Sequence, residues 1–171
     1  MKSNILIGLA VLAFMVSSCA TEDIDPGAAA NNELSGEWFV HYDHNFYGPD
    51  PFQVGYTRIL TSTTASQSAS ELIVTDEDNF WSYRVKARMD IQSKAFGSPD
   101  TLISYVDGYD IKVLVRNGRI FEDAITTAAG VVTDSIYFEI WFEDLEDATG
   151  FTSDTLFVSG YRRTGFTEDE H

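Results

Sequence analysis

The single cysteine of the chain, Cys19, stands where an export leader would end. It follows Val16-Ser17-Ser18, an aliphatic residue and two small ones, which is the pattern of a bacterial lipobox. In that motif the small residues admit a signal peptidase, and the cysteine thiol takes a diacylglycerol group. The apolar run over residues 5–16 is about a dozen residues long, which suits a secretory leader and falls short of the roughly 20 that a membrane span needs. The pattern predicts a signal peptide over residues 1–18 and lipidation of Cys19.

Residues 19–32 are small, polar and acidic, which is typical of a flexible, lipidated tether. Two or more acyl chains, palmitate among them, hold a protein stably on a membrane. Glu22 and Asp23, close behind the cysteine, resemble the surface-export signal of Bacteroidetes lipoproteins. We therefore expect an outer-membrane, lipid-anchored protein displayed at the cell surface, with the membrane contacted through Cys19.

Catalysis by a hydrolase needs a nucleophile, a base and an oxyanion site. The sequence has no Gly-x-Ser-x-Gly elbow. His41 and His44 are three residues apart, whereas two ligands on one strand prefer a spacing of two. We interpret both as solvated loop residues and assign no role to His171. The prediction is no catalytic residue, no metal and no cofactor.

Acidic residues dominate the charge. The chain has 27 Asp and Glu against 11 Lys and Arg, a net charge of −16. This balance argues against nucleic acid as a partner and against flat docking on anionic lipid. Asp76-Glu77-Asp78-Asn79 and residues 143–147 offer the hard oxygen ligands that Ca²⁺ prefers, but the first lacks the glycine and distal glutamate of an EF-hand loop. We interpret both segments as turns.

The elements that must position any site have a period of two, which indicates strands. Apolar residues take the odd positions from Trp81 to Ile91, and Ile136 begins a second alternating series. Asn117-Gly118 predicts a two-residue hairpin turn. Candidate strands lie near residues 36–43, 53–61, 70–75, 80–92, 101–106, 110–116, 119–125, 131–143 and 154–163.

Many sequential strands joined by short turns favour one all-β domain over residues 33–166, a single antiparallel meander barrel, with a β-sandwich as the alternative. Residues 167–171 are expected to be a disordered acidic tail. An eight-stranded barrel has room for its own side chains or for one small ligand. The residues expected to line such a ligand site are Trp81, Tyr83, Val85, Met89, Phe138, Ile140 and Phe142.

The pair Gly36-x-Trp38 near the start of the β region resembles the first-strand motif of lipocalins and other calycin barrels. In those folds an arginine of the last strand packs over the tryptophan and closes one end of the barrel. The final predicted strand supplies Arg162 and Arg163 for that role, as a cation–π stack.

Two further segments, residues 131–140 and 159–166, look like the C-terminal signature of a Bacteroidetes lipoprotein family labelled "lipid-binding putative hydrolase", and Asp78-Asn79-Phe80-Trp81 fits its pattern. The resemblance implies a lipocalin-like barrel and a lipid ligand. The function expected first is therefore binding of a small apolar or lipid ligand without catalysis. A surface module that docks a partner protein or glycan is the second reading, and a lipid-ester hydrolase the third. The ligand's identity and the oligomeric state are left open.

Overall fold

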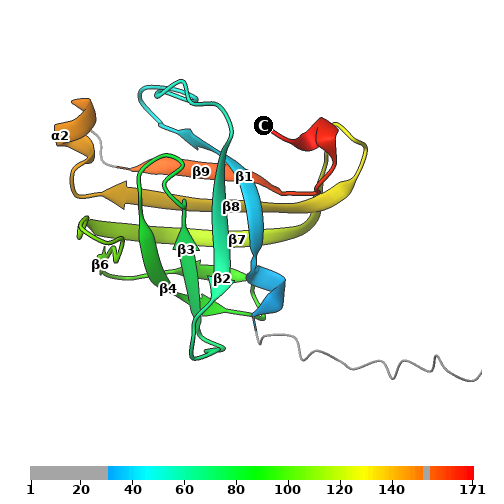
Figure 1. Ribbon diagram of the computed structural model, residues 1–171, viewed down its shortest axis with the longest axis horizontal. Coiled ribbons are helices and arrows are strands. Elements are labelled where there is room, and N and C mark those ends of the chain that lie inside the picture. Colours follow the sequence, from blue (N-terminus) through cyan, green and yellow to red (C-terminus); the bar gives the residue numbers. More distant parts are fainter. Residues whose placement is uncertain (1–30, 152–154) are drawn as a thin grey trace, which may run out of the picture.

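The computed structural model describes residues 31–151 and 155–171, and strands dominate it (Figure 1). The predicted signal peptide, Cys19 and most of the predicted tether lie outside these residues. The strands are β1 (Gly36–Asp43), β2 (Thr57–Thr63), β3 (Glu71–Thr75), β4 (Arg84–Asp90), β5 (Ala95–Gly97), β6 (Leu102–Ile103), β7 (Lys112–Thr126), β8 (Val132–Phe142) and β9 (Leu156–Arg162). Three short helical elements accompany them: η1 (Asn32–Leu34), α2 (Leu145–Thr149) and η2 (Thr167–Asp169). In the described part of the chain, no helix is long and apolar enough to cross a bilayer.

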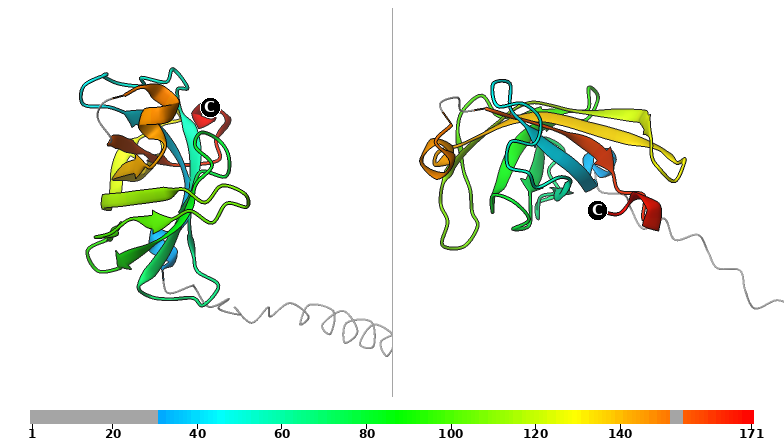
Figure 2. Two further views of the ribbon diagram at one scale, coloured as in Figure 1. Left: turned by 90° about the vertical axis from the view of Figure 1, so that its left-hand side faces the viewer. Right: turned by 90° about the horizontal axis from the view of Figure 1, so that it is seen from above.

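The sheet closes on itself. Neighbouring strands pair in the order β5-β4-β3-β2-β1-β9-β8-β7, and β5 also pairs with β7 through Ala95 opposite Arg119. The eight strands form an antiparallel barrel, and β6 pairs with β7 outside the ring. Two further views show the sheet curling round a common interior (Figure 2). The predicted all-β meander barrel is confirmed, and the β-sandwich alternative is wrong, because closure leaves a single continuous sheet.

The interior is built by alternation along each strand. Residues of β4 alternate exposed and buried along its whole length, and every second residue of β8 from Ile136 to Phe142 is buried. Each large apolar side chain buried in this way contributes about 1.5–3 kcal/mol to folding. The largest fully buried side chains are Trp38, Tyr42, Tyr83, Phe138, Phe142, Leu34, Ile59, Leu72, Ile136, Ile140, Leu145 and Leu156.

The Asn117-Gly118 pair lies within β7 and does not end a strand. Asn117 has the left-handed backbone that the dipeptide favours, with φ 53°, but the register with β8 shifts between Arg116 and Arg119 as at a β-bulge. A Cβ on Gly118 would lie 2.5 Å from the ring of Phe96 in β5. The predicted hairpin turn is therefore wrong: the pair bends one long strand and lets β5 approach closely enough to close the barrel.

Other elements differ in length from the prediction. The strand expected over residues 80–92 begins at Arg84, because residues 76–83 form a loop around a buried carboxylate. The strand expected over residues 101–106 shrinks to the two residues of β6. β5 and α2 were not predicted, since segments of three and five residues are too short to show a period.

Residues 167–171 fold back onto the outer face of β1 and β9 and contradict the expected disorder. Asp169 is buried, and its carboxylate accepts the Ala129 N–H at 2.9 Å. The His171 ring nitrogen Nε2 lies 2.6 Å from the Tyr161 hydroxyl. The acidic composition suggested disorder, but one buried carboxylate and one ring give the tail specific contacts.

Candidate functional site

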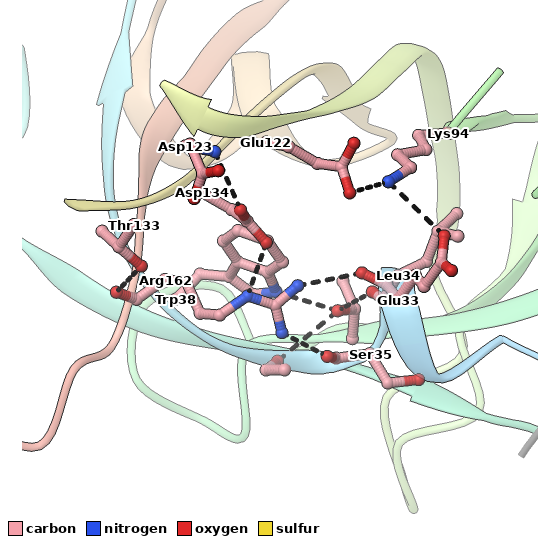
Figure 3. Close-up of polar contacts among 12 residues, drawn as sticks. Glu33, Leu34, Ser35, Trp38, Lys94, Glu122, Asp123, Thr133, Asp134 and Arg162 are labelled. Atoms are coloured by element: carbon pink, nitrogen blue, oxygen red, sulfur yellow. Dashed lines mark hydrogen bonds and ion pairs between the residues drawn. The ribbon is translucent and has the colours of Figure 1, made fainter. Parts of the chain in front are cut away.

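One end of the barrel, called here the closed end, is plugged by the fully buried Trp38 of β1. The guanidinium carbon of Arg162, at the end of β9, lies 4.4 Å from the centre of the Trp38 ring (Figure 3). Gly36 leaves room for this stack, because a Cβ there would collide with the Arg162 guanidinium. The structure thus brings together three of the four residues expected to close the barrel.

Hydrogen bonds fix the Arg162 side chain in place. Its Nε donates to Asp134 at 3.1 Å, and Nη1 and Nη2 donate to the carbonyl oxygens of Ser35 and Glu33 at 2.5 and 2.9 Å. The fourth expected residue, Arg163, points the other way, as the next residue in a strand must. It forms ion pairs on the outer surface with Glu37 and Glu170, both at 2.7 Å.

Beneath Arg162, the Trp38 Nε1 donates to the Thr61 hydroxyl at 2.8 Å, and that hydroxyl donates to the Leu34 carbonyl at 2.6 Å. The closed end is therefore a hydrogen-bonded plug in which the side chains of Arg162, Trp38 and Thr61 all have protein partners. Such an end has a structural role and offers a ligand little.

The seven residues expected to contact a ligand divide into two groups. Six point into the lumen, where Met89 is 8% exposed and the other five are fully buried: Tyr83, Val85, Phe138, Ile140 and Phe142. Side chains thus occupy the lumen where these residues lie. The seventh, Trp81, precedes β4 and lies at the opposite end of the barrel from Trp38, half-buried and stacked on Phe142 with ring centres 5.0 Å apart. Ligand contact by the six lumen residues stays a prediction.

Two tyrosines form a polar contact inside the lumen. The hydroxyls of Tyr42 and Tyr83 lie 3.3 Å apart, and both residues are fully buried. Burial, with the nearby Asp76 carboxylate, raises the pKa of Tyr42 far above its ordinary value. The pKa of Tyr83 is also raised, chiefly by burial. Both stay protonated at any physiological pH, so neither is a base or a nucleophile there.

The loop over residues 76–83 is organised by one buried carboxylate, Asp76. Its Oδ2 accepts the backbone N–H of Phe80, Trp81 and Ser82 at 3.0, 2.6 and 3.0 Å. Its Oδ1 accepts the N–H groups of residues 78 and 83 at 3.2 and 3.1 Å. Five N–H donors on one carboxylate set the backbone of the loop and thereby the directions of Phe80 and Trp81.

Beside this loop lies a hollow, called here the mouth groove, with a volume of about 610 Å³. It is bounded by the 76–83 loop, by the segment between β6 and β7, and by α2, on the side of the barrel away from the tail (Figure 1). Its volume is within the range of small-ligand sites, about 300–1,000 Å³. The residues that line it are Asp78, Phe80, Trp81, Ser82, Val106, Asp107, Tyr109, Asp144 and Ala148.

Asp144, immediately before α2, ties two walls of the groove together. It accepts a hydrogen bond from Trp81 Nε1 at 3.0 Å and another from the Tyr109 hydroxyl. Burial, together with the Asp144 carboxylate, raises the pKa of Tyr109 to about 12. Tyr109 is therefore a neutral donor that holds the carboxylate, and the Trp81 indole has a fixed orientation.

Aromatic rings continue from the groove across this end of the barrel. Phe80 packs on Tyr42 at 4.3 Å and on Phe52 at 4.9 Å between ring centres. Phe151 stacks on Tyr47 at 4.0 Å. Ring packing between loops, in place of a hydrogen-bonded plug, covers the lumen here.

The histidines do not come together. His41 lies on the outer face of β1 with its ring 3.7 Å from that of Tyr56. His44 is only 3% exposed. Its Nδ1 accepts hydrogen bonds from the backbone N–H groups of Phe46 and Tyr47 at 3.0 and 3.1 Å. The interpretation of His44 as a solvated residue is wrong, because its ring forms the inside of a tight loop.

His171, for which no role was predicted, lines a second hollow of about 550 Å³ between the tail and the outer face of β1 and β2. Its ring stacks on Tyr56 at 4.2 Å between centres. Among the described residues, no group of three or more His, Cys, Asp or Glu is placed to hold a metal ion.

Sequence reasoning missed Asp76, Tyr109 and Asp144. The available signal was a run of acidic residues directly before two aromatic residues, from Asp76 to Trp81. Acidic turns are common on a chain of this charge, so the pattern alone does not separate a buried carboxylate from a solvated one.

A family model described as "lipid-binding putative hydrolase" matches residues 23–167, a range that contains every strand of the barrel. No curated protein matches the chain.

Proposed function

Since the chain belongs to the family described as "lipid-binding putative hydrolase", we propose that it binds a small apolar or lipid ligand in the mouth groove and does not catalyse a reaction on it. The observation that carries the proposal is the groove itself. It joins an apolar floor to a few fixed polar groups, which is the usual composition of a small-molecule site.

Trp81 is the central contact in this proposal. It is half-buried, held by Asp144 at 3.0 Å and backed by Phe142. A fixed, half-exposed indole offers apolar area at a low cost in side-chain entropy. Val106 and Ala148 extend the apolar surface on either side.

The lumen is the weaker location for the ligand. Its side chains are already buried against one another, and displacing any one of them would cost about 2–5 kcal/mol in lost packing. An acyl chain in the groove requires no such displacement. It would lie over the Phe80 and Trp81 rings that line the groove, with Trp81 stacked on the buried Phe142.

The proposal places the barrel on a lipid anchor at Cys19 in the outer membrane, facing the cell exterior. The acidic tether would keep the barrel away from the anionic surface. Mass spectrometry of the purified protein should find a diacylglyceryl group on Cys19, and Cys19→Ala should leave the protein in the soluble fraction. A Cys19→Ala protein that stays with the membrane would contradict the anchor.

The experiment that tests lipid binding uses a neutral dodecyl chain brominated near its end, because bromine quenches indole fluorescence on contact. The chain has three tryptophans in different places: Trp38 in the closed end, Trp81 in the groove and Trp141 on the outer side of β8. Saturable quenching is expected in the parent protein and in Trp141→Phe, and its loss is expected in Trp81→Phe.

Quenching that persists in Trp81→Phe and disappears in Trp141→Phe would move the ligand to the outer face and favour a docking surface. Absence of quenching in every variant would contradict lipid binding. A parallel assay with short-chain and long-chain esters should show no turnover above buffer, and saturable turnover would contradict the non-catalytic part of the proposal.

A further inference from the structure

The rim of the mouth groove carries three carboxylates, on Asp78, Asp107 and Asp144. Within the described residues, no ion pair joins any of the three to a lysine, arginine or histidine. The partners of Asp144 are the neutral Trp81 indole and Tyr109 hydroxyl. No cationic side chain is among the described residues that line the groove. Its negative charge is therefore uncompensated.

This is not the pattern in other hollows of the protein. The hollow beside the tail contains Arg58 and Arg163, each ion-paired with a glutamate. Of the cations near the groove, Arg58 pairs with Glu77 at 3.3 Å and Lys112 with Glu143 at 2.5 Å. Arg84 follows the 76–83 loop, and its charge acts on Tyr105 and not on a groove carboxylate. The groove combines apolar floor and unpaired carboxylates, so its charge is a local feature and not only the average of an acidic chain.

The polar and apolar parts of the groove lie side by side. The Trp81 indole is hydrogen-bonded at its edge to Asp144 and stacked on Phe142, and it lines the groove beside the carboxylates. An aromatic face attracts a cation, and it does so more strongly when carboxylates stand beside it.

We infer that the mouth groove selects an amphiphile with a cationic headgroup, whose alkyl chain lies on Phe80 and Trp81 and whose ammonium group faces Asp78, Asp107 and Asp144. This inference rests on the proposed lipid binding and specifies its ligand class. An anionic headgroup, such as that of a free fatty acid, meets three negative charges in the same place and is disfavoured.

The test compares amphiphiles that share a dodecyl chain and differ in headgroup: trimethylammonium, maltoside and sulfate, each below its micelle concentration. Tetramethylammonium, which has no chain, is the headgroup control. Calorimetric titration should give one site, with the trimethylammonium compound binding about tenfold more tightly than the maltoside and the sulfate more weakly than both. The preference should shrink as salt rises.

The variant Asp78→Asn/Asp107→Asn removes two charges and keeps Asp144 with its hydrogen bonds. Asparagine tolerates the left-handed backbone of residue 78, where φ is 65°. The variant should bind the trimethylammonium and maltoside compounds about equally. Asp100→Asn, an exposed residue in the loop between β5 and β6, is the matched control and should keep the preference.

The outcomes separate the two proposals. Equal binding of all three dodecyl compounds, dependent on Trp81, would overturn the headgroup inference and leave lipid binding standing. Equal losses in Asp100→Asn and in the double variant would reveal a general charge effect and overturn the inference. Absence of binding by any compound would overturn both proposals.

Discussion

The two ends of the barrel are covered by different chemistry. At the closed end, Arg162 lies on Trp38 and reaches Asp134 and two backbone carbonyls. At the mouth, aromatic rings from three loops pack on one another, and the loop that carries Phe80 and Trp81 is held by Asp76. One end is cross-linked by polar contacts between strands, whereas the other is covered by loops.

The difference indicates where a ligand can be accommodated. A plug of satisfied hydrogen bonds must break several of them to admit a molecule. Ring pairs between loops can separate with smaller losses, because each pair is worth only about 0.5–1.5 kcal/mol beyond its buried area and loops lie at the low-stability end of a structure. The closed end therefore has only a structural role, whereas the mouth binds the ligand on a loop that Asp76 holds in place, and the following variants test that division.

The largest effect on stability is expected from Asp76→Ala, which leaves five backbone N–H groups of the 76–83 loop without their acceptor. Urea unfolding should show a loss of about 3–5 kcal/mol in the free energy of unfolding, because hydrogen bonds to a charged group are worth about 1.5–3 kcal/mol each but are not additive. Lipid binding should be lost as well. Asp78→Asn in the same loop is the control and should change stability by less than about 0.5 kcal/mol. A native-like Asp76→Ala protein would contradict the role given to this carboxylate.

Arg162→Met should destabilise the protein by about 2–3 kcal/mol, because it leaves Asp134 unpaired and removes the cover of Trp38. The Arg162 side chain is 25% exposed, so the expected loss is below that of a fully buried pair. Binding per folded molecule should be unchanged. Arg163→Met, next in the chain but on the surface, should cost less than about 1 kcal/mol; an equal cost for both would remove the contrast between the two ends.

Trp81→Ala should have the opposite signature to Arg162→Met. Its half-buried ring should contribute only about 1–2 kcal/mol to stability, but acyl-chain affinity should fall at least about tenfold. Parallel urea unfolding and calorimetric titration measure the two quantities. A large stability loss with unchanged affinity would assign the mouth a structural role as well.

The smallest effect concerns pH and the tail. Burial acts to raise the pKa of Asp169, but hydrogen bonds from the Thr164 hydroxyl and the Ala129 N–H hold it below its ordinary value. A lowered folded pKa means that the contribution is fully present above the unfolded pKa of about 3.9 and is lost as the pH falls through the lower folded value. NMR signals of His171 should therefore report tail release only below about pH 4. Asp169→Asn should shift or abolish that transition, and release near neutral pH would contradict the assignment.

Much of the fold could be predicted from the sequence. Alternation through β4 and β8 predicted which faces are buried, because the period of a strand is two residues whatever its partners. Gly36-x-Trp38 with an arginine in the last strand predicted residues that do meet at the closed end. These features depend on spacing within one strand or on a short motif.

The remainder depends on contacts between distant segments. Asn117 supplies a positive φ for either a turn or a bulge, and only the nearby Phe96 decides between them. Trp81 was predicted to contact a ligand, but its place at the mouth follows from Asp76, whose loop replaces the regular strand before Arg84. The tail was expected to be free because no local pattern reveals the partners of Asp169.

The most direct test of the account is NMR of the protein with a neutral dodecyl chain that carries a nitroxide spin label. If the mouth groove binds the chain, backbone signals from Ser82, Val106 and Ala148 around the groove will broaden selectively. Signals from Gly36 and Thr61 at the closed end will be unaffected. Broadening at Gly36 and Thr61, or equal broadening at both ends, would contradict the claim that the mouth is where this barrel binds lipid.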